Sequence, residues 1–165
     1  MGIKASIGQD SHAFEEQTGK PLILGGVTFD GYPGMRANSD GDVVLHALTN
    51  AVSGITCRNI LGSIADKMCK SGITDSSKYL EEALRDLAAL NRKITHVSFT
   101  IECLRPKLAP KTEEMRERIG ALLNIPASCV GITATTGEGL TAFGRGEGIM
   151  VFCILTTCEE EESVS

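Results

Sequence analysis

Two short strings of this sequence are rich in side chains that bind metal ions. Residues 8–14 read G-Q-D-S-H-A-F and contain Asp10 and His12, and residues 38–46 read N-S-D-G-D-V-V-L-H and end on His46. Imidazole nitrogen and carboxylate oxygen are typical zinc ligands, and three protein ligands leave a fourth position open for chemistry. Taken alone, an Asp-x-His string is more often a hydrogen-bonded pair on the surface, and a histidine in the position of His46 is more often an ordinary helical residue.

The elements around these strings decide whether they can meet. Apolar residues alternate over residues 3–7, which predicts a strand that continues through the first string. Residues two apart on a strand share a face, so Asp10 and His12 can point to the same spot while Ser11 is turned away. We expect the two strings to converge and to hold one divalent metal ion.

A helix is expected to begin near Ser39 or Asp40, because both are good N-cap residues and the apolar residues that follow recur at helical spacing. The other expected elements are strands over 21–24, 27–29 (followed by a loop), 96–101, 130–136 and 149–157, and helices over 59–70, 78–91 (capped by Asp75 or Ser76) and 111–123. This order predicts an α/β fold, an α+β sandwich with a single mixed β-sheet and helices mainly on one face. Residues 1–158 are expected to form one domain, and residues 159–165 an acidic disordered tail.

Composition excludes several classes of protein. The 165 residues carry a formal net charge of −5 and no Trp, so neither a basic face for nucleic acid nor a base-stacking platform is expected. The six cysteines form no Cys-x-x-Cys pair and several lie in apolar runs, which favours free thiols over disulfides. Neither a signal peptide nor an apolar run of about 18 residues stands out, so a soluble, cytoplasmic protein is expected.

Several loop residues have the chemistry of a phosphate site. Loops that contain Pro or Gly carry three cationic residues, Arg105, Lys107 and Arg145. Fixed cations in such loops bind phosphate, although plain surface charge explains each residue taken alone. Thr135 and Thr136 can donate hydroxyls to phosphate oxygens, or they can simply reflect β-propensity. Glu138, in a glycine-rich loop, has an oxygen ligand suited to a harder cation such as Mg²⁺.

Taken together, the strings resemble those of the 2-C-methyl-D-erythritol 2,4-cyclodiphosphate synthase family over nearly the whole chain. The matching strings are residues 8–14 (GQDSHAF), 24–27 (LGGV), 39–48 (SDGDVVLHAL), 106–107 (PK), 134–136 (ATT), Glu138 and 144–149 (GRGEGI). The resemblance implies a homotrimer with active sites between neighbouring subunits. It also implies a phosphorus–oxygen lyase that converts 4-diphosphocytidyl-2-C-methyl-D-erythritol 2-phosphate to the 2,4-cyclodiphosphate and releases CMP, a step in isoprenoid precursor synthesis.

The same resemblance implies two metal ions in each active site. One Zn²⁺ per subunit is implied to bind the residues that match the family ligands, Asp10, His12 and His46. A second divalent ion, Mg²⁺ or Mn²⁺, is implied to bind Glu138 together with the substrate diphosphate. Two cations of this kind would draw the phosphates together and stabilise the leaving CMP.

The resemblance further implies which residues contact the substrate. Asn38 and Thr136 are implied to assist catalysis directly. The implied substrate contacts are Asp10, Ser11, His12, Asn38, Ser39, Gly62, Asp66, Cys103, Leu104, Arg105, Pro106, Lys107, Leu108, Ala109, Thr135, Thr136, Gly137, Glu138 and Arg145. Arg145 also matches a family residue near the trimer axis, where an isoprenoid diphosphate can bind.

The chain departs from the family pattern on the substrate side. Asn38 stands where the family has His and cannot carry its positive charge. Ile60 replaces the Asp of a D-I-G string, residues 65–69 (ADKMC) replace F-P-D-T-D, and Gly137 replaces a Thr. Asp66 is a candidate for the lost carboxylate. Two alternatives therefore stay open: a phosphotransferase or lyase for another cytidylylated substrate, and a non-catalytic trimer that binds an isoprenoid or nucleotide diphosphate.

Overall fold

The computed structural model describes residues 2–160. In chain order the elements are β1 (Lys4–Glu15), β2 (Pro21–Leu24), β3 (Val27–Met35), α1 (Val43–Thr56), α2 (Ser63–Lys70), α3 (Ser76–Ala89), β4 (Arg92–Glu102), α4 (Thr112–Leu123), β5 (Val130–Thr135) and β6 (Gly148–Glu159), with 3-10 turns at Ala109–Lys111, Ala127–Cys129 and Gly137–Gly139. Over this range the strands form one sheet in the order β2-β3-β1-β6-β4-β5. β4 and β5 are parallel and the other pairs are antiparallel, which confirms the predicted single mixed sheet.

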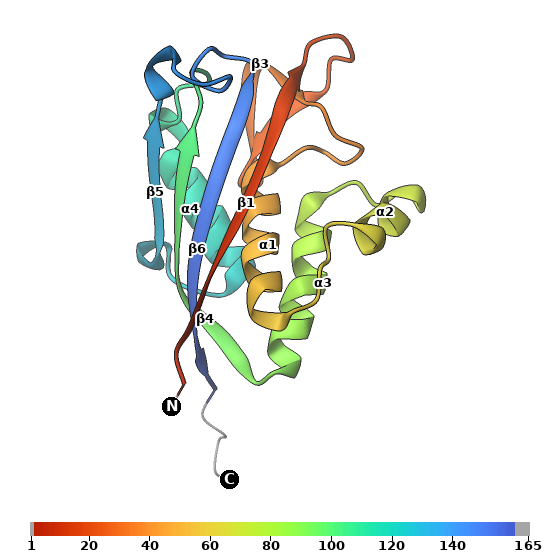
Figure 1. The fold of residues 1–165 in the computed structure, drawn as a ribbon, viewed down its shortest axis with the longest axis vertical. Helices are drawn as coiled ribbons and strands as arrows, with labels where there is room; N and C mark the ends of the chain where they lie inside the picture. The colour runs from red at the N-terminus through yellow and green to blue at the C-terminus, as the bar shows by residue number, and fades with distance from the viewer. Residues whose placement is uncertain (1, 161–165) are drawn as a thin grey trace.

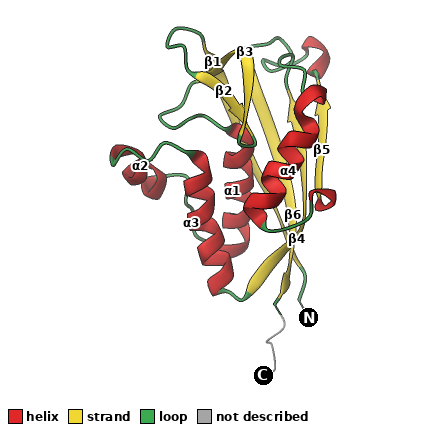
Figure 2. Ribbon diagram, turned by 180° about the vertical axis from the view of Figure 1, so that it is seen from behind, coloured by secondary structure: helices red, strands yellow, loops and turns green. Residues whose placement is uncertain are grey.

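The helices cover one face of the sheet, as the sequence predicts (Figure 1). Seen from behind, α1 and α4 stand in front of the strands, and α3 lies beside α1 (Figure 2). α1 packs on β1 and β6, α4 packs on β5, and α3 packs on α1. Side-chain alternation distinguishes the two faces. On β6 the helix-facing Val151, Cys153 and Leu155 are buried, whereas Phe152 and Ile154 on the open face are 39% and 52% exposed.

The start of α1 differs from the prediction. The predicted cap is Ser39 or Asp40, but the helix begins at Val43 and its N-cap is Asp42. One oxygen of Asp42 accepts the backbone N–H of Leu45 at 3.0 Å. The same carboxylate accepts two N–H groups of the β2–β3 turn, at 2.9 and 2.7 Å. A contact with a distant segment therefore selects the cap among several suitable residues.

Other boundaries also differ, and β4 begins at Arg92 rather than at residue 96. The predicted loop after residue 29 is a strand, because β1 offers a partner for it and pairs Phe14 with Met35. The second helix begins at Ser63 rather than at residue 59. The predicted cap of α3 is confirmed, since the Asp75 side chain accepts the N–H of Ser77 at 2.9 Å.

The described residues bear on three predicted features: membrane-spanning helices, the state of the cysteines and the acidic tail. Between residues 2 and 160, no helix combines the length and the apolar character needed to cross a membrane. All six cysteines are free thiols, as predicted. β6 extends through Glu159, and the amide of Glu160 donates to the carbonyl of Asn91 at 2.9 Å. Residues 161–165 of the predicted acidic tail lie outside the described residues.

Candidate metal centre

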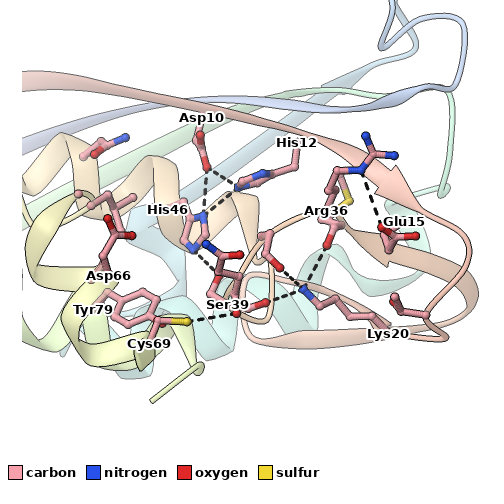
Figure 3. Close-up of a pocket in the computed structure, with 18 residues that line it drawn as sticks. Asp10, His12, Glu15, Lys20, Arg36, Ser39, His46, Asp66, Cys69 and Tyr79 are labelled. Carbon is pink, nitrogen blue, oxygen red and sulfur yellow. Dashed lines mark hydrogen bonds and ion pairs between the residues drawn. The ribbon is translucent and has the colours of Figure 1, made fainter. Parts of the chain in front are cut away.

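The side chains of Asp10, His12 and His46 meet at one point, as the sequence predicts (Figure 3). Oδ2 of Asp10 lies 3.0 Å from Nε2 of His12 and 3.1 Å from Nδ1 of His46. The two ring nitrogens are 3.2 Å apart. Two of the residues come from one face of β1 and the third comes from the first turn of α1. We call these three side chains the metal cage.

Gly8 allows α1 to lie directly against β1. A Cβ at this position would stand 2.1 Å from the carbonyl oxygen of Ala47 and 2.3 Å from the amide nitrogen of Ala51. Both are backbone atoms, so a larger residue would push the helix away from the strand. Because Ala47 directly follows His46, this close approach is what brings the imidazole within reach of β1.

The metal cage has the donor set and the charge of a divalent-metal site. Burial by itself raises the pKa of the Asp10 carboxyl, but hydrogen bonding and positive charge from the imidazoles of His12 and His46 outweigh burial and hold that pKa well below its usual range. Asp10 is therefore an anion at neutral pH. One carboxylate and two imidazoles form a common three-ligand zinc set with a fourth position open, so these residues fit a divalent transition metal.

The metal cage opens into a cavity of about 880 Å³. The residues of this cavity that the sequence analysis singled out are Asp10, His12, Asn38, Ser39, His46, Gly62 and Asp66. The sequence did not reveal the other eleven, which are the polar residues Glu15, Thr18, Lys20, Arg36, Asn50, Cys69 and Tyr79 and the apolar residues Met35, Ala37, Leu61 and Ala65. Two of these residues, Lys20 and Arg36, are cations that sequence features could have pointed to. Lys20 stands directly before a predicted strand, and Arg36 stands two residues before Asn38, in a region implied to bind phosphate.

Lys20 holds the loop that carries Asn38 and Ser39. Its Nζ donates to the carbonyl oxygens of Ser39 at 2.6 Å, Ala37 at 2.7 Å and Met35 at 3.3 Å. These neutral acceptors leave the positive charge of the ammonium group uncancelled at the cavity wall. Lys20 thus fixes the shape of the loop and supplies charge beside it.

The predicted phosphate loops meet at one end of the sheet, in what we call the phosphate-loop cluster, residues 103–109, 135–139 and 141–147. The amide of Cys103 donates to the carbonyl of Thr135 at 3.0 Å, and the amide of Leu104 donates to the carbonyl of Phe143 at 3.1 Å. The structure therefore brings together three strings that are separated in the sequence.

The side chains that the phosphate-loop cluster exposes have the chemistry expected of it. Lys107, Thr136 and Glu138 are exposed, whereas Cys103 and Leu108 are buried. Glu138 adopts a left-handed backbone conformation (φ 52°), and Oγ1 of Thr136 accepts its N–H at 3.3 Å. The turn at Thr136–Glu138 thus presents hydroxyl and carboxylate groups to the outside of the chain, and the neighbouring loop presents the ammonium group of Lys107.

Within one chain, the phosphate-loop cluster does not reach the metal cage. Between residues 2 and 160, none of its members lines the cavity. β5, which leads into residues 135–139, is separated from β1 by β6 and β4, a distance of about 14 Å at three strand spacings. Residues 141–147 adjoin the end of β1, where the amide of Phe14 donates to the carbonyl of Glu147 at 3.1 Å, but they do not line the cavity either. Arg105 instead pairs with Glu16 at 2.8 Å, and Arg145 pairs with Glu147 at 3.1 Å.

Three positions at which the sequence departs from the strings it resembles can be placed in the structure. Ile60 is fully buried and belongs to the core, whereas Asp66 lines the cavity. Gly137 has φ +71°, and a Cβ there would stand 2.2 Å from Oε1 of Glu102, so a threonine is excluded unless that carboxylate moves. Ser11, also among the candidate substrate contacts, alternates with the cage ligands along β1 and does not line the cavity.

A mixed sheet with helices on one face and a cage of one carboxylate and two imidazoles defines the class of protein, an α/β protein with a candidate metal site. The YgbB family model matches residues 3–158, and the chain belongs to this family. The 2-C-methyl-D-erythritol 2,4-cyclodiphosphate synthase of Chlamydia caviae is 54% identical over 158 residues, which cover 94% of this chain and 89% of that protein. The synthase of the same name from Chlamydia trachomatis serovar L2b is 51% identical and is covered to 88%.

Solved structures agree with this assignment. The bifunctional IspDF from Campylobacter jejuni superposes with a TM-score of 0.85 at 27% identity over 97% of this chain, and the chain spans 43% of that protein. A structure of 2C-methyl-D-erythritol-2,4-cyclodiphosphate synthase superposes with a TM-score of 0.80 at 31% identity, over 94% of this chain and 100% of that chain.

Proposed function

We propose that this protein is a 2-C-methyl-D-erythritol 2,4-cyclodiphosphate synthase. In the proposed reaction, the 2-phosphate of 4-diphosphocytidyl-2-C-methyl-D-erythritol 2-phosphate attacks the β-phosphorus of the same molecule. The new P–O bond closes the cyclic diphosphate, the bond to CMP breaks, and CMP leaves. The observation that carries the proposal is the metal cage open to a large cavity, in a chain 54% identical over most of its length to a protein of that name.

This reaction needs no nucleophile from the protein, because the substrate attacks itself. The protein must instead hold the substrate curled and offset the charge of its phosphates. Asp10, His12 and His46 would hold a zinc ion, and Glu138 would hold Mg²⁺ or Mn²⁺ together with the diphosphate. Bound there, such cations supply Lewis acidity and neutralise phosphate charge.

The cavity wall offers side chains that can compensate for the departures from the family. Asn38 lacks the charge of the family histidine, but Lys20 and Arg36 place two cations at the same wall. The guanidinium of Arg36 is largely exposed and lies 3.8 Å from Glu15, a loose ion pair that a phosphate can replace. Asp66 supplies a carboxylate for substrate hydroxyls.

A homotrimer would complete the site. No residue of the phosphate-loop cluster lines the cavity of its own metal cage in the described part of the chain, and a neighbouring copy can bring its cluster to that cavity. The open face of the sheet exposes Ile7, Phe152 and Ile154, an apolar surface that suits burial between subunits. Light scattering should report about three times the chain mass of 17.5 kDa, and a monomer would contradict the shared site.

The deciding experiment measures CMP release and metal content together. With substrate and Mg²⁺, the protein should release CMP and form the cyclic diphosphate, and elemental analysis should find about one zinc per chain. His46→Ala should lose both the zinc and the activity. His96→Ala is the matched control, because His96 is an exposed histidine on β4 outside the cavity. Folded, metal-loaded protein that releases no CMP would contradict the proposal.

One observation favours a second candidate function. Ile60 is buried where the family has a carboxylate, which removes a group associated with the methylerythritol hydroxyls. A phosphotransferase or lyase for another cytidylylated substrate would release CMP from that compound and not from the methylerythritol derivative. A non-catalytic trimer would bind CDP in a titration without turning over either substrate.

A further inference from the structure

The metal cage is backed by hydrogen-bonded groups that lead away from the cavity. Nε2 of His46, the ring nitrogen that does not face Asp10, lies 2.8 Å from Oγ of Ser76. That hydroxyl also hydrogen bonds to Oδ1 of Asp40, and Oδ2 of Asp40 accepts the backbone N–H of Ser76 at 3.0 Å. Ser76 is fully buried at the start of α3, so these contacts join α1, the loop before it and α3.

The direction of these hydrogen bonds determines where the ring proton of His46 resides. A carboxylate has no proton to donate, so the hydroxyl of Ser76 donates to Asp40 and must accept from the imidazole. Nε2 of His46 therefore carries a ring proton, so an imidazole that gives up its other proton to a metal presents the lone pair at Nδ1. Nδ1 is the atom that faces Asp10 and His12, which is the arrangement that a metal ligand requires.

Other groups around this nitrogen do not provide the same contact. Oγ of Ser39 lies 3.4 Å from Nε2 of His46 and already accepts the N–H of Gly41 at 3.1 Å. The ring of Tyr79 packs beside the imidazole, but its hydroxyl donates to the carbonyl of Ile73 at 2.6 Å. The short contact to Ser76 is thus the one that can orient the ring.

We propose that Ser76 and Asp40 are positioning residues of the metal centre. They hold the imidazole of His46 in one tautomer and one orientation, and they pass part of the carboxylate's negative charge to the ring. The proposal rests on the metal site of the proposed function. Hydrogen-bonded partners behind a metal-ligating histidine typically contribute 10- to 100-fold to metal affinity or activity.

The test compares zinc affinity among three variants by chelator competition. Ser76→Ala should weaken zinc binding roughly 10- to 100-fold. Ser76→Thr keeps the hydroxyl and should restore most of the affinity. Asp75→Ala is the matched control, because it removes the N-cap bond to Ser77 at the same end of α3 and leaves the contact to His46 in place. This control should melt at a lower temperature and bind zinc like the wild type.

A spectroscopic readout separates positioning from general destabilisation. In Co²⁺-substituted protein, Ser76→Ala should change the visible absorption spectrum of the ion, and Asp75→Ala should not. If Ser76→Ala does not fold by circular dichroism, Ser76→Cys keeps a similar volume with a weaker hydrogen bond and serves the same comparison. Unchanged zinc affinity in the Ser76 variant would overturn the proposal, and so would an equal loss in the Asp75 control.

The wild-type protein distinguishes this proposal from the proposed function. CMP release and zinc affinity are measured on the same preparation. An active wild type with unaffected zinc affinity in the Ser76 variant would overturn only the positioning role. A wild type that binds zinc and releases no CMP would overturn the proposed function, and the affinity comparison would still decide the role of Ser76. A wild type that binds no zinc would overturn both.

Discussion

Gly8→Ala should separate the two halves of the metal cage without touching a ligand. The added Cβ would lie 2.1 Å from the carbonyl oxygen of Ala47, and ordinary contacts begin at 3.4 Å, so α1 must move by about 1.3 Å. Ligand distances in zinc sites tolerate only about 0.2 Å. Because His46 moves with the helix, zinc affinity should fall by more than the roughly 100-fold that loss of an outer hydrogen bond can cost.

The same substitution should also destabilise the fold. Overpacking costs about 1–3 kcal/mol, and the upper end applies because the clash at Gly8 is with backbone atoms. Urea unfolding and chelator competition measure the two effects. Gly131→Ala is the control, since its Cβ would meet Ser98 at an ordinary 3.6 Å. Wild-type zinc affinity and stability in Gly8→Ala would refute the reasoning.

Three further predictions follow from burial and charge. Asp42→Ala leaves three backbone N–H groups without their acceptor and should lower the free energy of unfolding by about 3 kcal/mol in urea titrations at pH 7. Burial, with the nearby charge of Glu102, raises the pKa of the Cys103 thiol to about 11, so its thiolate forms only as pH approaches 11. At pH 8, iodoacetamide should label the exposed Cys57 and leave Cys103 unmodified by mass spectrometry; equal labelling would contradict this. Removing zinc with a chelator should lower the melting temperature of the wild type and should not change that of His46→Ala. If free zinc was at 100 times its Kd, its removal lowers the free energy of unfolding of the wild type by about 2.7 kcal/mol.

Local sequence patterns predict which helices and strands form, but they place the ends of these helices and strands poorly. The residue types and periods of β1, α1 and α3 are visible in the sequence, because burial on one face imposes them. The cap of α1 was misplaced, because Ser39, Asp40 and Asp42 are all suitable caps and the β2–β3 turn selects the last. β3 was cut short, because a strand rich in Gly and Pro continues only when a partner such as β1 lies beside it.

The sequence by itself determined the chemistry of the metal cage. Strand alternation places Asp10 and His12 on one face, since side chains two apart on a strand always share it. The resemblance of several strings to those of a known family also identified the residues of the phosphate-loop cluster. These features are local, and local geometry is encoded in residue type and spacing.

Only the tertiary structure decided what these groups touch. The imidazole of His46 meets Asp10 because Gly8 permits contact between backbones, and Ser76 reaches its far side from a helix thirty residues away. Lys20 and Arg36 enter the cavity wall from loops whose function no local pattern reveals. Two intervening strands separate β5, which leads into residues 135–139 of the phosphate-loop cluster, from the strand that carries Asp10 and His12. Long-range packing decides these arrangements, because they involve segments that are far apart in the sequence, and sequence distance does not determine distance in space.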